Sequence, residues 1–431
     1  MKDNKYKNPL FRMRFRLATA AALLLVCSVG IFGITQLFQS SITVSASASD
    51  LMEGISRNRV SGRAADDEFI TGMADFSIEL FKRSQTDKEN SLISPLSVML
   101  ALAMTANGAG NDTLTQMEAL LGSGIKMDEL NKYLFRYARS LPNQEKSKFT
   151  IANSIWFRDN NGMKVIPEFL QMNADYYGAS AYGAPFDRQT VRDINNWVDK
   201  NTNGMIKEII DEIAPNNMLF LINAIMFDAE WHQIYYEIDV RKRDFTDING
   251  IISNIDFMYG SEYLYLEDGM ATGFLKPYAG GAYSFAALLP NEEASVETYI
   301  GQLTGESFLD VINSAQIGLV ITAMPKFEYE YEISMIGALK EMGITDAFDD
   351  TKADFSRMAD MPVFISEVLH KTFISVDERG TKAGAVTIVS GDAGGAMPEP
   401  KYVLLDRPFV YAIIDNATNL PIFIGTLMTV Q

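Results

Sequence analysis

Residues 376–389 read VDERGTKAGAVTIV, and this stretch says more about the fold than any other in the chain. From Thr381 onward every second residue is small or β-branched and uncharged, and this set comprises Thr381, Ala383, Ala385, Thr387 and Val389. A strand that enters the middle of a sheet needs this alternation, because one of its faces must reach the core. No proline lies between Thr381 and Pro398, so each backbone N–H there can join a ladder, while Gly380 and Gly384 supply backbone freedom. The stretch therefore predicts a segment that can insert into a sheet, with an ordinary edge strand and flexible loop as the alternative.

The composition predicts a folded, acidic protein. Of the 431 residues, 47% are hydrophobic and 21% are charged, and the formal net charge is -18. A chain of this length and composition can build one large core or two smaller ones. An acidic surface repels phosphate backbones, so we expect no nucleic-acid partner.

Cysteine and histidine are too scarce for the common metal sites. Cys27 is the single cysteine, so neither an intrachain disulfide nor a thiolate cluster can form. The two histidines, His232 and His370, lie far apart in the chain, which excludes a two-histidine zinc motif on one helix. We expect neither a metal nor another cofactor.

The N-terminal region predicts export from the cytoplasm. Residues 17–38 carry no charge and would form a helix of about 33 Å, and a basic segment, residues 1–16, precedes them. The basic flank places everything after this run outside, where we expect an extracellular or membrane-anchored protein. The run is longer than a signal-peptide core, which favours an anchor, whereas the small residues at 45–48 suit cleavage of a signal peptide. Residues 39–65 are Ser-rich and then polar, which is typical of a linker.

The remainder, residues 66–431, predicts a mixed α+β domain. Helical patterns dominate its first third, and strand-like runs dominate the rest. The expected helices are 66–83, 91–106 with Ser94 and Pro95 at its start, 112–121 and 333–342, and the expected strands are 149–157, 218–227, 284–289 and 317–324.

Several short segments resemble, in chain order, the serpin family of serine protease inhibitors. They lie at 90–98, 152–157, 195–206, 221–231, 325–327, 353–356, 365–371, 376–381, 406–409 and 423–425. The resemblance covers roughly residues 66–431. It implies a single domain of about three β-sheets and eight or nine helices, with an exposed reactive-centre loop near the C-terminus.

The resemblance also implies an inhibitor that is not an enzyme and acts as a suicide substrate. The partner is a target serine protease, which cleaves the loop and is held as a covalent acyl complex while the loop inserts into the central sheet. We expect a monomer that meets a membrane only through residues 17–38. A non-inhibitory serpin that acts as a binding or chaperone module is the alternative, and a serine hydrolase is disfavoured because no G-x-S-x-G occurs.

The same resemblance assigns the loop and gate residues. The hinge comprises Glu378, Gly380, Thr381, Ala383 and Ala385, and the region where the sheet opens comprises Ser94, Ser97, Asn223 and His370, with Trp231 near the top of the sheet. His232 matches no family role, and we expect it on the surface.

The scissile bond stays open on sequence grounds. Counting forward from Glu378 gives Gly394, whereas counting back from Pro408 gives Met397, and the candidates are Ala393, Gly394, Ala396 and Met397. A bond between Met397 and Pro398 is a poor one for serine proteases. Arginine and lysine are absent between positions 382 and 401, so the small or apolar residues favour elastase-like or subtilisin-like proteases.

Overall fold

A computed structural model describes residues 47–159, 162–381 and 399–430. The predicted segments 1–16 and 17–38, the hinge residues Ala383 and Ala385, and all four scissile-bond candidates lie outside the described residues. Within the described ranges, no helix combines the length and the hydrophobicity needed to cross a membrane.

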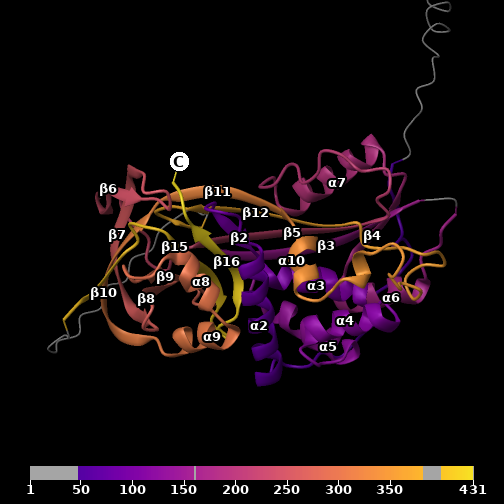
Figure 1. Ribbon diagram of the computed structural model, residues 1–431, viewed down its shortest axis with the longest axis horizontal. Helices are drawn as coiled ribbons and strands as arrows, with labels where there is room; N and C mark the ends of the chain where they lie inside the picture. The colour runs from indigo at the N-terminus through magenta and orange to yellow at the C-terminus, as the bar shows by residue number, and fades with distance from the viewer. Residues whose placement is uncertain (1–46, 160–161, 382–398, 431) are drawn as a thin grey trace, which may run out of the picture. The chain divides into compact units, whose positions relative to one another are not determined.

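A seven-stranded sheet forms the centre of the domain (Figure 1). Its strand order is β1 (Ser49–Asp50), β4 (Ser180–Ala184), β3 (Ser147–Arg158), β5 (Leu219–Glu230), β13 (Gly380–Thr381), β12 (Glu367–Val376) and β11 (Phe327–Ser334). The long strands β3 and β5 pair antiparallel over eleven positions, from 147–157 to 219–229.

The unbroken apolar run of β5 is explained by cover on both faces. Phe220, Ile222 and Ala224 pack with residues of α7 (Arg188–Asn201), while Leu219 and Leu221 belong to the main core with α3 (Pro95–Ala106). Figure 1 shows α7 and α3 on opposite sides of the strands. The sequence prediction of a strand buried on both faces at 218–227 is confirmed.

The remaining strands form a nine-stranded sheet. Its order is β14 (Lys401–Leu404), β10 (Gln316–Pro325), β7 (Ile252–Glu267), β8 (Ala271–Pro277), β9 (Tyr283–Pro290), β15 (Phe409–Asp415), β16 (Pro421–Leu427) and β2 (Ser91–Ile93), and β6 (Val240–Thr246) pairs with β7. β7 pairs with β6 through 252–258 and with β10 through 257–265, but with β8 only through 264–267. The path can therefore be divided at β7, which agrees roughly with the three sheets expected.

Nine α-helices occur in the described ranges, as expected. Besides α3 and α7 they are α2 (Asp67–Arg83), α4 (Asn111–Gly122), α5 (Met127–Ser140), α6 (Pro167–Tyr177), α8 (Val296–Gln302), α9 (Gly305–Asn313) and α10 (Ile336–Glu341). The side chain of Asp66 caps α2 by accepting from the backbone N–H of Phe69. All twelve residues of α3 are buried, so this helix is part of the core.

Two predicted helices begin later than their sequence patterns indicate. Residues 91–93 form β2, because they pair with 424–426 of β16, and α3 starts only at Pro95. Ser94 precedes α3 as expected, but its side chain makes no capping hydrogen bond. Residues 333–334 belong to β11, because they pair with 369–370 of β12, and α10 starts at Ile336.

The described part of the predicted linker, residues 47–65, lies against the domain. Its strand β1 pairs with β4, and Leu51 and Ile55 pack on the core. The backbone N–H of Asn58 donates to Asp175 Oδ1 at 2.6 Å, and the Asn58 amide donates to Asp175 Oδ2 at 3.1 Å. These contacts tie the segment to α6.

Candidate functional site

The central sheet is split between β5 and β12 over part of its length. In the described chain, β5 and β12 pair directly only through 220–223 and 367–370. Further along, β13 lies between them, with Gly380 opposite Glu230 and Thr381 opposite both Ala229 and Val376. Two of the hinge residues, Gly380 and Thr381, therefore already occupy a strand position inside the sheet.

The turn before β13 is held by backbone contacts. The indole Nε1 of Trp231 donates to the Asp377 carbonyl at 2.9 Å, and the backbone N–H of Trp231 donates to the Arg379 carbonyl at 2.8 Å. The backbone N–H of Tyr235 donates to the Glu378 carbonyl at 2.9 Å. Trp231, the residue expected near the top of the sheet, thus contacts the hinge directly.

The two residues of β13 fit closely into their position. A Cβ added at Gly380 would lie 2.0 Å from the Ala229 carbonyl oxygen, so only glycine allows this approach. Thr381 is 3% exposed, and its hydroxyl lies 2.7 Å from the hydroxyl of Tyr278. Thr381 thus faces inward, as the alternating pattern predicts.

An ion pair fixes the charged hinge residue. Lys326 Nζ lies 2.7 Å from Glu378 Oε1, and both side chains are about one-third exposed. Burial would raise the pKa of Glu378, but the hydrogen bond and charge of Lys326 outweigh burial and lower it below its ordinary value. Glu378 is therefore ionised in its native setting.

A buried polar cluster lies beneath Trp231. The Trp231 ring stacks on Tyr278 with centroids 4.6 Å apart, and Lys276 Nζ lies 5.2 Å from the Trp231 ring centroid. Lys276 also pairs with Glu262 at 2.8 Å, and both side chains are almost fully buried. Sequence reasoning missed this cluster, although a lysine in the otherwise apolar run GFLKPY at 273–278 was a usable signal.

The residues predicted where the sheet opens meet at the point where β5 and β12 come together. His370 of β12 pairs in register with Asn223 of β5. The backbone N–H of Ser94 donates to His370 Nε2 at 3.1 Å, the Ser97 hydroxyl donates to the Asn223 side-chain oxygen, and the Asn223 amide donates to the Ser97 carbonyl at 3.2 Å. The structure therefore brings all four together and adds Asn153, which accepts from the Asn223 amide.

His370 is held uncharged by burial. Its side chain is fully buried, and burial lowers its pKa to about 3. Within the described residues, neither His370 Nδ1 nor the Ser94 hydroxyl has a hydrogen-bond partner. His232, in contrast, is exposed, as expected.

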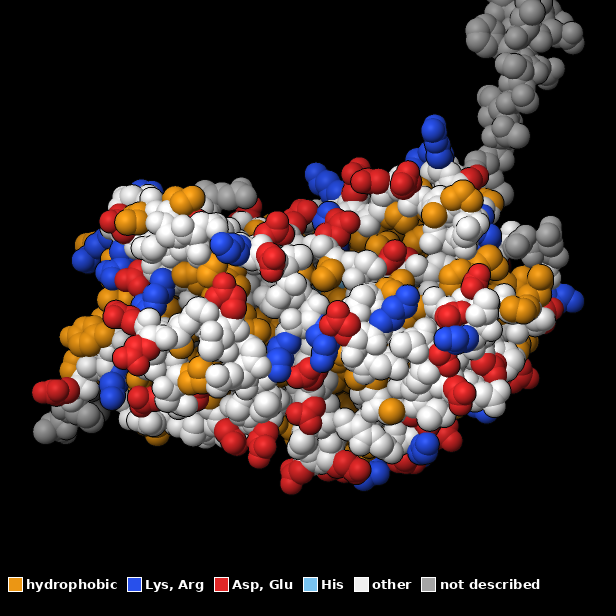
Figure 2. All heavy atoms as spheres, in the orientation of Figure 1, with side chains coloured by type: hydrophobic (Ala, Val, Ile, Leu, Met, Phe, Trp, Pro, Cys, Tyr) orange, Lys and Arg blue, Asp and Glu red, His pale blue; other side chains and the backbone are white. Residues whose placement is uncertain are grey.

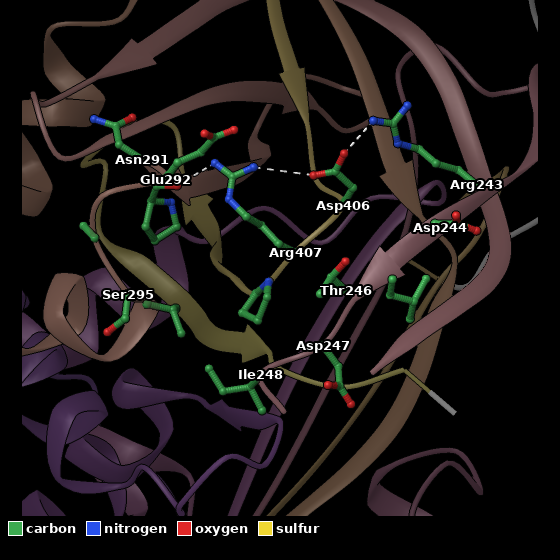
Figure 3. A pocket seen from close by; sticks show the side chains of 15 residues that line it. Arg243, Asp244, Thr246, Asp247, Ile248, Asn291, Glu292, Ser295, Asp406 and Arg407 are labelled. Carbon is green, nitrogen blue, oxygen red and sulfur yellow. Dashed lines mark hydrogen bonds and ion pairs between the residues drawn. The ribbon is translucent and has the colours of Figure 1, made fainter. Parts of the chain in front are cut away.

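A different set of contacts holds the chain after the bait. β14 pairs parallel with β10 through four residues. Asp406 pairs with Arg243 at 2.5 Å and with Arg407 at 3.5 Å, and Arg407 Nη2 donates to the Pro290 carbonyl at 2.8 Å. These side chains line a surface pocket of about 830 Å³ beside the β6–β7 turn, and Figure 3 shows Asp406 between the two arginines. The hydrogen bond with Asp406 raises the pKa of Arg243 above its ordinary value.

Metal-ligating side chains are not gathered in this region. Among the residues that the structure describes, no group of three or more His, Cys, Asp or Glu side chains is placed to hold a metal ion. The site thus consists of the parted strands β5 and β12, the hinge residues held between them, and the segment at Asp406 that is held by two arginines.

Comparison with known proteins identifies the family. The family model Serpin (serine protease inhibitor) matches residues 71–430. An uncharacterized serpin-like protein of Thermococcus kodakarensis is 30% identical over 83% of this chain and 85% of its own, and neuroserpin of Homo sapiens is 29% identical over 83% of this chain and 90% of its own. The native state of the thermophilic serpin tengpin is 55% identical, with a TM-score of 0.85 over 89% of this chain and 100% of that one, and its latent state gives 53% and 0.77 over 86% and 100%. The chain belongs to the serpin family.

Proposed function

We propose that this chain inhibits serine-type endopeptidases by offering residues 393–397 as bait and then inserting the hinge into the central sheet. The observation that carries the proposal is the position of β13, since Gly380 and Thr381 lie between β5 and β12 where these strands part. A hinge that already occupies the strand position needs no separate opening step to begin insertion.

The sheet offers room for further insertion. Beyond the hinge, 224–228 of β5 and 371–375 of β12 are not paired with each other. A strand that continued from Thr381 in the same register would place residues 382–386 opposite both stretches, with Ala383 and Ala385 as its inward residues. Each new ladder hydrogen bond contributes about 0.5–1.5 kcal/mol, so five positions on two sides supply a substantial driving force.

The chemistry of trapping follows from the order of the steps. The protease serine oxygen bonds to the bait carbonyl carbon, the peptide C–N bond breaks, and the released amine takes the proton. The acyl-enzyme stays attached to the hinge side of the cut. Insertion of that side then moves the protease before water can break the ester.

The bait composition selects the target class. Residues 393–397 are Ala, Gly, Gly, Ala and Met, which fit the narrow or apolar pockets of elastase-like and subtilisin-like proteases. The apolar run at 17–38 and its basic flank support a location outside the cytoplasm, secreted or anchored.

The test is incubation of the full chain with a subtilisin, an elastase and trypsin. We expect an SDS-stable complex with the first two and little with trypsin, together with a C-terminal fragment whose mass places the cut within 393–397. Cleavage without a stable complex would contradict inhibition and favour a non-inhibitory binding or chaperone module. A cut outside 390–398 would contradict the bait assignment alone.

A further inference from the structure

One lysine and one glutamate lie inside the described domain rather than on its surface. Figure 2 shows charged side chains of both signs spread over the visible face, where water solvates them. Lys276 of β8 and Glu262 of β7 are instead 3% and 8% exposed, and Lys276 Nζ lies 2.8 Å from Glu262 Oε1. The segment GFLKPY at 273–278 is otherwise free of charge. The position of this ion pair therefore calls for an explanation.

Stability alone does not explain the buried pair. Removing two charges from water is costly, and replacing a buried ion pair by apolar side chains of similar volume is often neutral or stabilising. The residues before Lys276 in β8, Phe274 and Leu275, belong to the apolar core, so an apolar residue at 276 would suit the same strand. The pair is better explained by what the ammonium group holds.

The ammonium group of Lys276 joins β7 and β8 to the chain segment that follows β5. Besides its pair with the glutamate, Lys276 Nζ donates to the Gln233 carbonyl at 3.1 Å. It also lies 5.2 Å from the ring centroid of Trp231 and 4.3 Å from that of Tyr235, distances at which an aromatic ring attracts a cation. Lys276 thus contacts the first, third and fifth residues of the segment 231–235.

The same segment also holds the hinge turn. The backbone and indole N–H groups of Trp231 and the backbone N–H of Tyr235 all donate to carbonyls of residues 377–379. The contacts with Lys276 use two rings and one carbonyl, whereas the contacts with the hinge turn use N–H groups, so both sets are made at once. The segment therefore links the buried ammonium group to the turn that leads into β13.

We propose that Lys276 is a positioning residue that holds the hinge in its strand position between β5 and β12, with Glu262 as its counter-charge. Without the ammonium group, the rings of Trp231 and Tyr235 lose a common contact, and the N–H groups that fix residues 377–379 can shift. The consequence for trapping rests on the proposed function above. Insertion competes with hydrolysis of the acyl ester, so a hinge that leaves its position gives water more time to release the protease.

A purely structural role of the pair is the competing explanation, and the double variant Glu262→Leu/Lys276→Met separates the two. It exchanges the pair for apolar side chains of similar size and leaves no buried charge unpaired, so we expect a urea midpoint close to that of wild type. The backbone N–H groups of Trp231 and Tyr235 should still exchange with solvent about tenfold faster, as measured by NMR. Unchanged exchange of both groups would overturn the proposal, and equally faster exchange throughout β8 and β9 would assign the pair a structural role alone.

The matched control is Asp256→Leu/Lys242→Met, which makes the same exchanges at an ion pair between β6 and β7. Lys242 and Asp256 lie 3.1 Å apart and are 61% and 45% exposed, so their pair is screened by water. We expect exchange at Trp231 and Tyr235 to stay within about twofold of wild type. An effect equal to that of the test variant would mean that the loss of any nearby ion pair loosens the hinge, which would overturn the specific role of Lys276.

Titration with an active subtilisin separates this proposal from the proposed function. We expect the test variant to raise the inhibitor-to-protease ratio about threefold or more. If wild type forms no covalent complex but exchange at Trp231 and Tyr235 is faster in the test variant, inhibition fails and the positioning role stands. If wild type traps the protease and exchange in the test variant is unchanged, inhibition stands and the positioning role fails.

A measurement on wild type keeps the proposal testable even if the test variant does not fold. The backbone N–H groups of Trp231 and Tyr235 should exchange slowly, because each is hydrogen-bonded to the hinge turn. Exchange of both as fast as that of solvent-exposed N–H groups would show that the segment does not hold the hinge, and would overturn the proposal.

Discussion

The chain before the bait, at the hinge, and the chain after it, at β14 and Asp406, are held by different kinds of contact. At the hinge, backbone carbonyls of 377–379 accept from Trp231 and Tyr235, and Thr381 contacts one hydroxyl between two parted strands. At the distal end, β14 pairs with β10 alone among the described strands, and Asp406 binds two arginines.

This difference indicates whether the hinge or the segment after the bait can move. The hinge occupies a strand position between β5 and β12, and these strands are not paired with each other at 224–228 and 371–375. The residues that follow the hinge can therefore add backbone hydrogen bonds on both sides. The distal contacts are charged and depend on particular side chains, Asp406 with Arg243 and Arg407. The fold therefore favours motion at the hinge and a fixed point near Asp406.

Among the variants considered, Thr381→Arg is expected to have the largest effect, which is a loss of trapping through the hinge. A guanidinium at a 3% exposed position would be buried without a charge partner, at a cost of several kcal/mol. We expect the hinge to leave the sheet and the bait to be cleaved without trapping, raising the inhibitor-to-protease ratio about tenfold or more in an active-site titration. Thr381→Ser keeps the hydroxyl that meets Tyr278 and should resemble wild type. Trapping by the arginine variant at the wild-type ratio would show that entry of Thr381 is not needed.

The pH dependence of stability tests the role of His370, which lies where the parted strands β5 and β12 come together. Its pKa is about 3 in the folded chain and about 6.5 when exposed, so the unfolded chain binds the extra proton between these values. Its contribution to stability is complete above pH 6.5 and falls as the pH drops toward 3, by about 3 kcal/mol at pH 4. Urea unfolding at pH 7, 5 and 4 should show that the free energy of unfolding falls less with acidification in His370→Gln than in wild type. Carboxylates titrate in both proteins, so identical pH dependence of the two would refute the role of His370.

The variant Asp406→Ala tests whether the distal contacts contribute to stability but not to trapping. Removing the carboxylate leaves Arg243 and Arg407 without their shared partner, and we expect a loss of about 1–2 kcal/mol in urea unfolding. The inhibitor-to-protease ratio should not change, because the distal end does not enter the sheet. Asp244→Ala makes the same charge change at an exposed neighbour and should cost less. A variant that lost trapping at full stability would mean that the distal end also takes part in insertion.

Lys326→Ala carries the smallest expected effect. The pair with Glu378 is partly exposed, so its loss should cost less than about 1 kcal/mol and should matter less at high salt. The pKa of Glu378 is lowered, so the pair stabilises the fold above the ordinary pKa near 4.5 and is lost as the pH falls through the lowered value. Thermal melts at two salt concentrations measure this, with Lys242→Ala, at the more exposed pair with Asp256, as the control. An effect as large as that of Thr381→Arg would mean that the ion pair, rather than burial, holds the hinge.

Patterns along the chain predicted elements whose signals are local. The helix expected at 66–83 is α2, because its apolar spacing and the cap at Asp66 lie within one segment. Residues 91–93 and 333–334 were assigned to helices incorrectly, because their strand character depends on β16 and β12, which come much later in the chain. Neither partner is visible in a short window of sequence.

The candidate site divides in the same way. Thr381 was expected to face inward from alternation alone, and the structure places it there. Ser94, Ser97, Asn223 and His370 were grouped through the family resemblance, and they do meet. Asn153, Tyr278 and the buried pair of Glu262 and Lys276 were missed, because each acts through a partner on another strand.

By itself, the sequence determined the acidic character, the α+β class, the alternation at the hinge and the small residues of the bait. These properties depend on residue type and on spacing within one segment. Only the tertiary structure decided where β5 and β12 part and which groups hold the chain on each side of the bait. Those facts depend on strand register between distant segments, and register is set by packing of the whole core rather than by any single stretch of chain.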